Sequence, residues 1–123
     1  MKITIETIPH LSQRYPTLGD WQFDKEGNLN IKVSQELKHK SFILVAIHEL
    51  IEAILCDQDR ITEDKVDAFD MNYNGPFFEP GEDPRCPYHK QHHFAEIIEK
   101  LTANQIDFPW GFHENECTRV ITS

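Results

Sequence analysis

Residues 41–56 read SFILVAIHELIEAILC, and this stretch organises the predicted fold. It is apolar almost throughout and too short to span a membrane, so it predicts a helix buried in a domain core. Three polar residues lie in its middle: His48, Glu49 and Glu52. At 100° per residue, Glu52 lies about 40° from His48 and Glu49 about 100° from it, which places all three on one face. Because a carboxylate buried without a partner is costly, this face needs a partner.

The motif His48-Glu-Leu-Ile-Glu52 has the spacing of a helical metal site. Helices with the motif HExxH present two imidazoles to zinc and use the glutamate as a general base. Here Glu52 replaces the second histidine, and a carboxylate oxygen is also an accepted zinc ligand. We therefore interpret His48 and Glu52 as metal ligands and Glu49 as the candidate catalytic base. The metal-free alternative is a salt-bridged patch in which His48 and Glu52 meet a lysine or arginine from another helix.

A catalytic zinc site needs a third protein ligand and leaves its fourth position to water. The candidates are His89, His92 and His93, which follow a proline-rich stretch. Among them we favour His92 and then His89, and the alternative is that all three are solvated residues at a helix start. Asp67 and Asp70 are candidates either for orienting a ligand imidazole or for direct ligation, and otherwise are solvated helix residues.

The cysteines suggest a rival zinc site. Cys86 and His89, together with His113 and Cys117, have spacings that could form a closed structural site with four ligands. However, His113 and Cys117 belong to an apolar helical stripe, which favours core packing, and free cysteines are commonly buried. The odd total of three cysteines does not suggest a disulfide framework, so a reducing cytoplasm is the simpler expectation.

Length and charge set the broad class. The 123 residues fit one compact domain, residues 1–123. With 21 acidic and 12 basic residues, the net charge is −9, which argues against nucleic acid as a partner. The N-terminus lacks the continuous apolar core of a signal peptide, and no segment is a membrane-span candidate.

The remaining patterns predict an α+β fold, with a small N-terminal antiparallel sheet packed on three to four helices. Residues 2–8 alternate like a strand, and residues 21–24 and 28–33 flank a turn like a hairpin. A second helix begins after Thr62, and residues 74–87 are too rich in proline and glycine for a helix interior or a central strand. Residues 88–103 predict a third helix with an inward apolar stripe, and Pro109 starts a last helix. The stripe of the third helix comprises Phe94, Ile97, Ile98 and Leu101.

Four segments resemble a small family of phage and prophage proteins with zincin-like features. They are HELIE, VDAFD, GEDPRCPYHKQH and FAEIIEKL, and the resemblance covers residues 42–101. HELIE is similar to the active-site helix of zincin metallopeptidases, which implies a zincin-like fold with His48 as a ligand and Glu49 as the base. Glu52 departs from the zincin pattern. The third ligand has no counterpart in the motif, so His92 and His89 rest on the residue pattern alone.

These observations predict a metal-binding domain of minimal zincin type. Zinc is the favoured ion, and manganese and iron(II) also accept imidazole and carboxylate ligands. The first functional hypothesis is a metal-dependent hydrolase or peptidase that acts on a peptide or small-molecule substrate. The alternative is a non-enzymatic, metal-stabilised accessory or assembly protein of a phage. In both cases we expect a cytoplasmic protein of a bacterial or phage-infected cell, with neither membrane nor nucleic acid as a partner.

Overall fold

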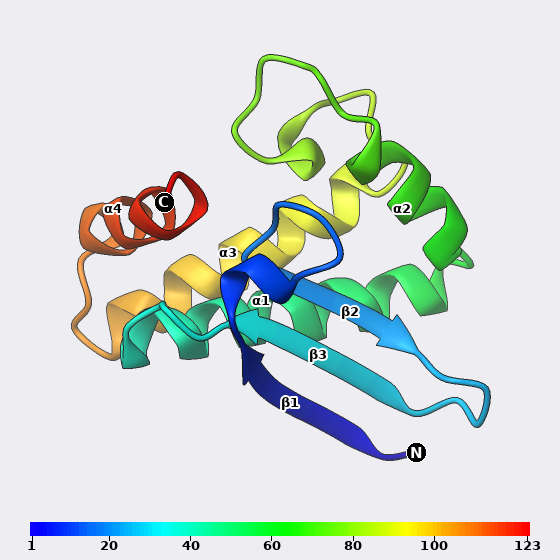
Figure 1. The fold of residues 1–123 in the computed structure, drawn as a ribbon, viewed down its shortest axis with the longest axis horizontal. Helices are drawn as coiled ribbons and strands as arrows, with labels where there is room; N and C mark the ends of the chain where they lie inside the picture. Colours follow the sequence, from blue (N-terminus) through cyan, green and yellow to red (C-terminus); the bar gives the residue numbers. More distant parts are fainter.

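The computed structural model describes all residues from 1 to 123 and has an α+β fold (Figure 1). It contains three strands, four α-helices and two short 3₁₀ helices, η1 and η2. In chain order the elements are β1 (Ile3–Ile8), η1 (His10–Ser12), β2 (Gly19–Phe23), β3 (Leu29–Ser34), α1 (His39–Gln58), α2 (Glu63–Met71), η2 (Pro80–Glu82), α3 (His89–Gln105) and α4 (Trp110–Ile121).

The sheet is mixed, with strand order β1-β3-β2. The predicted hairpin is confirmed: β2 and β3 are antiparallel and are joined by a turn in which Gly27 has a φ of 81°. The expectation of a fully antiparallel sheet is wrong, because β1 pairs with β3 in parallel. The segment between β1 and β2 carries η1 past the end of β3, so β1 lies on the far side of β3 from β2 (Figure 1). Strand direction depends on this crossover and not on the alternation within a strand.

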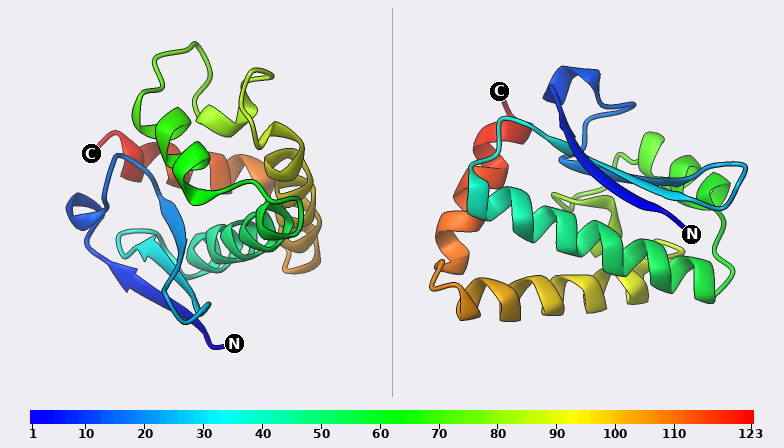
Figure 2. Two further views of the ribbon diagram at one scale, coloured as in Figure 1. Left: turned by 90° about the vertical axis from the view of Figure 1, so that its right-hand side faces the viewer. Right: turned by 90° about the horizontal axis from the view of Figure 1, so that it is seen from below.

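Helix α1 lies between the sheet and α3, as the view from below shows (Figure 2). The apolar face of β3, Leu29, Ile31 and Val33, is fully buried beneath it. This burial follows from strand geometry, since alternate side chains point to the same face of a sheet. The helix begins at His39, two residues before the predicted apolar stretch, and Ser41 is buried within its first turn.

Helix α3 faces α1 with its polar side, contrary to the prediction. Phe94 is 48% exposed and Leu101 is 59% exposed, whereas His92 and Glu99 are buried. The expected inward stripe therefore points largely to solvent. The physical reason is that hydrogen bonds to polar groups on α1 fix the rotation of α3, and burying these groups unpaired would cost more than exposing a few apolar side chains.

Helix α2 and the proline-rich loop close the top of the molecule, and α4 lies against one end of the helix layer (Figure 1). The predicted cap of α2 is present, because the Thr62 side chain accepts a hydrogen bond from the Lys65 amide. The loop packs against α3 through η2, and the Tyr73 hydroxyl donates to Asp83. None of the helices combines the length and apolarity that crossing a membrane requires.

Candidate metal centre

Three side chains from α1 and α3 converge on one point. His48 Nε2 lies 3.1 Å from Glu52 Oε2 and 3.2 Å from His92 Nδ1, and His92 Nδ1 lies 2.9 Å from Glu52 Oε2. All three residues are buried. His48 and Glu52 meet because they are one helical turn apart. His92 joins them because α3 packs along α1.

The loop before α3 leaves space for the His92 ring. A Cβ atom on Gly81 would lie 2.4 Å from both Cγ and Nδ1 of His92, so only glycine fits here without moving the imidazole. The carbonyl oxygen of Gly81 lies 2.9 Å from His89 Nδ1. His89 thus fastens the loop to α3 and does not join the cluster.

Carboxylates stand behind both imidazoles. His48 Nδ1 lies 2.8 Å from Glu99 Oε1, and His92 Nε2 lies 3.0 Å from Glu79 Oε2. Glu99 also contacts His113 Nε2 at 2.5 Å. An imidazole that binds a metal through one nitrogen commonly donates its other N–H to a carboxylate, which fixes the tautomer and the ring orientation. The arrangement behind His48 matches that pattern, whereas Glu79 lies within ion-pair distance of His92 Nε2 without forming a hydrogen bond to it.

Glu52 is held in the same way from the sheet. The indole Nε1–H of Trp21 donates to Glu52 Oε1 at 3.1 Å, which leaves Oε2 facing the two imidazoles. Behind Glu99 the network continues through His113, whose Nδ1 lies 2.9 Å from the Ser41 hydroxyl. The cluster is therefore positioned by β2, α3 and α4 as well as by α1.

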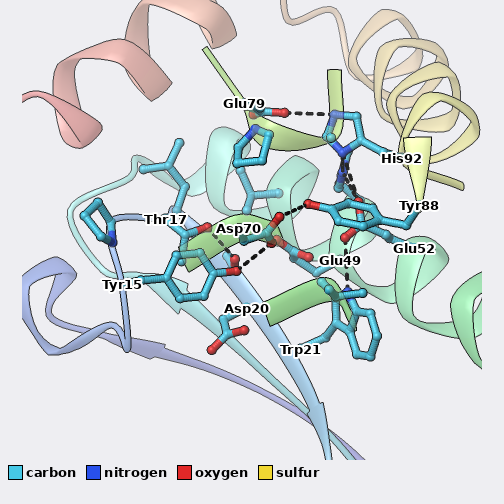
Figure 3. Close-up of a pocket in the computed structure, with 18 of the residues that line it drawn as sticks. Tyr15, Thr17, Asp20, Trp21, Glu49, Glu52, Asp70, Glu79, Tyr88 and His92 are labelled. Carbon is cyan, nitrogen blue, oxygen red and sulfur yellow. Dashed lines mark hydrogen bonds and ion pairs between the residues drawn. The ribbon is translucent and has the colours of Figure 1, made fainter. Parts of the chain in front are cut away.

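A cavity of about 370 Å³ adjoins the cluster and is lined by His48, Glu49, Glu52 and His92 (Figure 3). Glu49 projects into it without a hydrogen bond or ion pair, although only 9% of this residue is exposed. Gly19 makes room for this side chain, since a Cβ atom there would lie 2.5 Å from Glu49 Oε1. A group that binds at the cluster from the cavity side would meet Glu49.

Burial and charge oppose each other at the cluster. Burial lowers the pKa of His92, but the carboxylates of Glu52 and Glu79 outweigh it and raise that pKa to about 10. Burial also lowers the pKa of His48, yet its contacts with Glu52 and Glu99 hold that pKa well above the ordinary value. Burial raises the pKa of Glu49 far above its usual range, and the negative charge of Glu52 adds to the effect.

The donor set fits a divalent metal ion. His48, Glu52 and His92 each offer one ligand atom, and these atoms are mutually close enough to hold an ion. Tetrahedral zinc with bonds of about 2.0–2.2 Å places its ligand atoms roughly 3.3–3.5 Å apart. The observed separations of 2.9–3.2 Å are close to that spacing. In addition, the buried His92 Nε2 has no well-formed hydrogen bond, as expected for a ring whose partners tighten when an ion binds.

The other candidates from the sequence lie elsewhere. His93 is exposed on α3. Asp67 forms an ion pair with Arg14 at 2.9 Å. Asp70 accepts hydrogen bonds from the hydroxyls of Tyr15 and Tyr88, so it does not orient an imidazole.

The rival zinc site is not assembled. His113 and Cys117 contact each other in the core, where His113 belongs to the network behind Glu99. Cys86 and His89 do not join them, and His48, Glu52 and His92 form the one group of three such side chains whose ligand atoms lie close enough together to hold a metal ion. Burial raises the pKa of the Cys86 thiol to about 12, which disfavours a thiolate.

Several residues of the site were not predicted: Glu79, Glu99, His113, Trp21, Tyr15 and the two glycines that make room for side chains. One signal was present, because Glu99 lies seven residues after His92 and so shares its face of α3. The assumption that the apolar stripe faced inward concealed it. No local sequence pattern indicates the contacts of Gly19, Gly81 and Trp21 with the site, because each contact joins segments that are far apart in the chain.

Comparisons with known proteins add no further identification. No protein-family model, curated protein or solved structure matches the chain.

Proposed function

We propose that this protein is a metal-dependent hydrolase of zincin type, with His48, Glu52 and His92 as ligands of a zinc ion. The observation that carries the proposal is the convergence of three ligand atoms within 2.9–3.2 Å at the wall of a cavity into which the unpartnered Glu49 projects. Structural zinc sites are closed by four protein ligands, whereas catalytic sites have three and keep one position open. Three ligands beside a cavity favour catalysis.

The chemistry would be hydrolysis of an amide or a related carbonyl compound. A zinc ion supplies Lewis acidity and lowers the pKa of a water molecule to about 7. Glu49, which lines the same cavity as the three ligands, would accept a proton from the attacking water as its oxygen adds to the carbonyl carbon. When the C–N bond breaks, Glu49 returns the proton to the leaving amine, so the reaction consumes one water and regenerates the carboxylate. Glu99 and Glu79 keep the imidazoles oriented throughout.

Metal content tests the first part of the proposal. Protein purified without a chelator should contain about one equivalent of zinc by elemental analysis. His92→Ala should lose most of this metal, whereas His93→Ala, one residue further along α3 and exposed, should retain it. Equal metal content in both variants, or none in the unaltered protein, would contradict the proposed ligand set.

Turnover tests the second part. Glu49→Gln should retain zinc but lose at least about 100-fold in rate against a panel of fluorogenic peptides and amides. Glu26→Gln, which removes a charge from the exposed hairpin turn, is the matched control and should remain active. A Glu49→Gln variant as active as the control would exclude Glu49 as the base.

One observation favours a second candidate function. The three ligands join α1 to α3, the central pair of packed helices, so a bound ion would stabilise the fold even without catalysis. In that case zinc should raise the melting temperature, no substrate should be hydrolysed, and spectroscopy of a cobalt-substituted sample should show a closed coordination sphere.

A further inference from the structure

The cavity beside the cluster is strongly acidic. No lysine or arginine lines it. Three of its carboxylates contact imidazoles of the cluster and its surroundings, and five more line the remaining wall: Asp20, Glu49, Glu63, Asp67 and Asp70.

Most of these five carboxylates have partners within the protein. Asp20 and Asp67 share Arg14, with nitrogen–oxygen distances of 2.7 and 2.9 Å. Glu63 accepts a hydrogen bond from the Phe23 amide. Three members of the set, Glu49, Glu63 and Asp70, have neither a lysine nor an arginine beside them, and of these three only Glu49 accepts no hydrogen bond. A cation that enters the cavity would therefore meet carboxyl groups that no lysine or arginine already pairs.

Glu49 is the strongest sign of a missing ligand. It is nine-tenths buried, points into the cavity and contacts no hydrogen-bond donor. Buried carboxylates are normally paired or bound to a cation, because an unpaired buried charge is costly. A metal ion at the neighbouring cluster compensates Glu52 directly, since Glu52 is a ligand. Glu49 is not one of the converging ligands, so its unpaired carboxyl group marks this part of the cavity as a place that a ligand occupies, and Asp70 lines the same cavity.

Aromatic rings complete this wall. The Tyr15 hydroxyl donates to Asp70 at 3.0 Å, and Tyr88 donates to the other oxygen of the same carboxylate (Figure 3). Burial raises the pKa of Tyr15, and the negative charges of Asp70, Asp20 and Glu49 raise it further. Carboxylates combined with aromatic rings are the chemistry that recognises ammonium and guanidinium groups, through ion pairing and cation–π attraction.

We propose that the cavity selects substrates that carry a protonated amine or a guanidinium close to the hydrolysed bond, with Asp70 and the rings of Tyr15 and Tyr88 as specificity-determining groups. This inference rests on the proposed hydrolase function. The positive charge belongs either to the α-amine of a peptide or to a lysine or arginine side chain. Both present the same chemistry to Asp70.

A matched substrate series at pH 7, where an α-amine is mostly protonated and Asp70 mostly ionised, separates these sources of charge. It compares arginine, lysine, norleucine and glutamate at the position before the cleaved amide, each with a free and with an acetylated α-amine. We expect kcat/KM for the preferred cationic substrate to exceed that of its neutral isostere by about tenfold or more. Added salt should lower kcat/KM for the cationic substrate and leave kcat/KM for the neutral isostere unchanged. Loss of the preference on acetylation assigns the charge to the α-amine; its persistence assigns it to the side chain. Equal rates across the series would overturn the inference while leaving the hydrolase proposal intact.

A pair of variants tests whether Asp70 determines the preference for cationic substrates. Asp70→Asn should reduce the ratio of kcat/KM between the cationic and the norleucine substrate, mainly through a higher KM for the cationic one. Asp57→Asn removes the same charge near the exposed end of α1, outside this cavity, and should leave the preference unchanged. An unchanged preference in Asp70→Asn would contradict the assignment of Asp70.

If no substrate in the series is hydrolysed, that result refutes only the hydrolase proposal. A binding measurement then tests whether the cavity prefers cations. Calorimetry of the zinc-loaded protein with lysinamide and with agmatine, an amine with a guanidinium, should show salt-sensitive binding that weakens in Asp70→Asn. The neutral analogue norleucinamide acetylated at its α-amine should bind more weakly. Absence of binding by both cations would overturn the inference.

Discussion

Glycine at two positions allows the key side chains of the site to take up their places. Gly19 lies against Glu49 and Gly81 lies against the His92 ring, each so close that a methyl group would overlap. Neither position requires a positive φ angle, since Gly27 is the only glycine with one. These glycines are needed for space beside the cluster and not for backbone conformation.

Substitution of Gly81 tests this requirement for space. In Gly81→Ala the new methyl group should push the His92 imidazole away from Glu52, so zinc affinity should fall by about tenfold or more, as it does when groups that orient a ligand are lost. Competition with a chromogenic chelator measures the affinity. Gly111→Ala is the control, because a Cβ atom on Gly111 meets nothing within 4 Å, and its zinc affinity should be unchanged. Equal affinities in the two variants would show that the ring adapts.

Glu99 orients His48 from behind the cluster. Glu99→Gln removes the negative charge and can accept a hydrogen bond from only one of the two imidazoles that the carboxylate now contacts. We expect zinc affinity to fall by about 10- to 100-fold in the same chelator assay. Glu114→Gln, at an exposed position of α4 away from the cluster, should change affinity little. A Glu99→Gln variant that binds zinc normally would show that His48 needs no support from α3.

Among the secondary-structure elements, α3 shows how a polar network can fix the rotation of a helix. Its inner face carries His92 and Glu99, and its outer face carries the apolar residues Phe94, Ile97 and Leu101. The solvent-facing side of α1 is also apolar and includes the exposed Ile54. Both helices therefore present aliphatic side chains to solvent. Hydrophobic periodicity alone would rotate α3 by half a turn.

Denaturation experiments test the rotation of α3. Phe94→Ala should change the free energy of unfolding by only about 0.5 kcal/mol, because the ring is already half exposed. Leu44→Ala, at a fully buried position of α1, should cost about 2–5 kcal/mol. Urea unfolding followed by circular dichroism measures both values. Comparable losses would place Phe94 in the core and contradict the orientation described here.

Across the whole molecule, Asp70 joins three segments that are distant in sequence. It lies on α2 and accepts from Tyr15 before β2 and from Tyr88 at the start of α3. Burial raises the pKa of Asp70 to about 6, and the negative charge of Glu52 adds to this while the tyrosine hydrogen bonds oppose it. The contacts that join α2 to Tyr15 and Tyr88 at the cavity thus depend on a carboxyl group with a pKa of about 6.

The sign of the resulting pH dependence follows from linkage. The folded-state pKa of Asp70 exceeds the unfolded value of 3.8, so the folded protein binds more protons between about pH 4 and 6. The contribution of Asp70 to stability is fully present below pH 4 and is lost as the pH rises through about 6. We expect the unaltered protein to lose on the order of 3 kcal/mol relative to Asp70→Asn across this window, measured by urea unfolding. A constant difference between the two proteins would contradict the raised pKa.

Local sequence patterns were sufficient for the elements whose formation depends on near neighbours. The apolar run at residues 41–56 predicted the central helix and the shared face of His48 and Glu52, because helical periodicity brings residues four apart together. Alternation and a turn predicted the hairpin, and Thr62 predicted the start of α2. Each of these features depends on interactions between residues a few positions apart.

The remaining features depend on packing between distant segments. The parallel pairing of β1, the rotation of α3, the choice of His92 over His89 and the support from Glu99 and Trp21 all follow from how complete elements meet. A helix with an apolar and a polar face has two possible inward faces, and the sequence of α3 favoured the apolar one. The buried groups on α1 reversed that choice, because an unpaired buried polar group costs more free energy than an exposed phenylalanine or leucine.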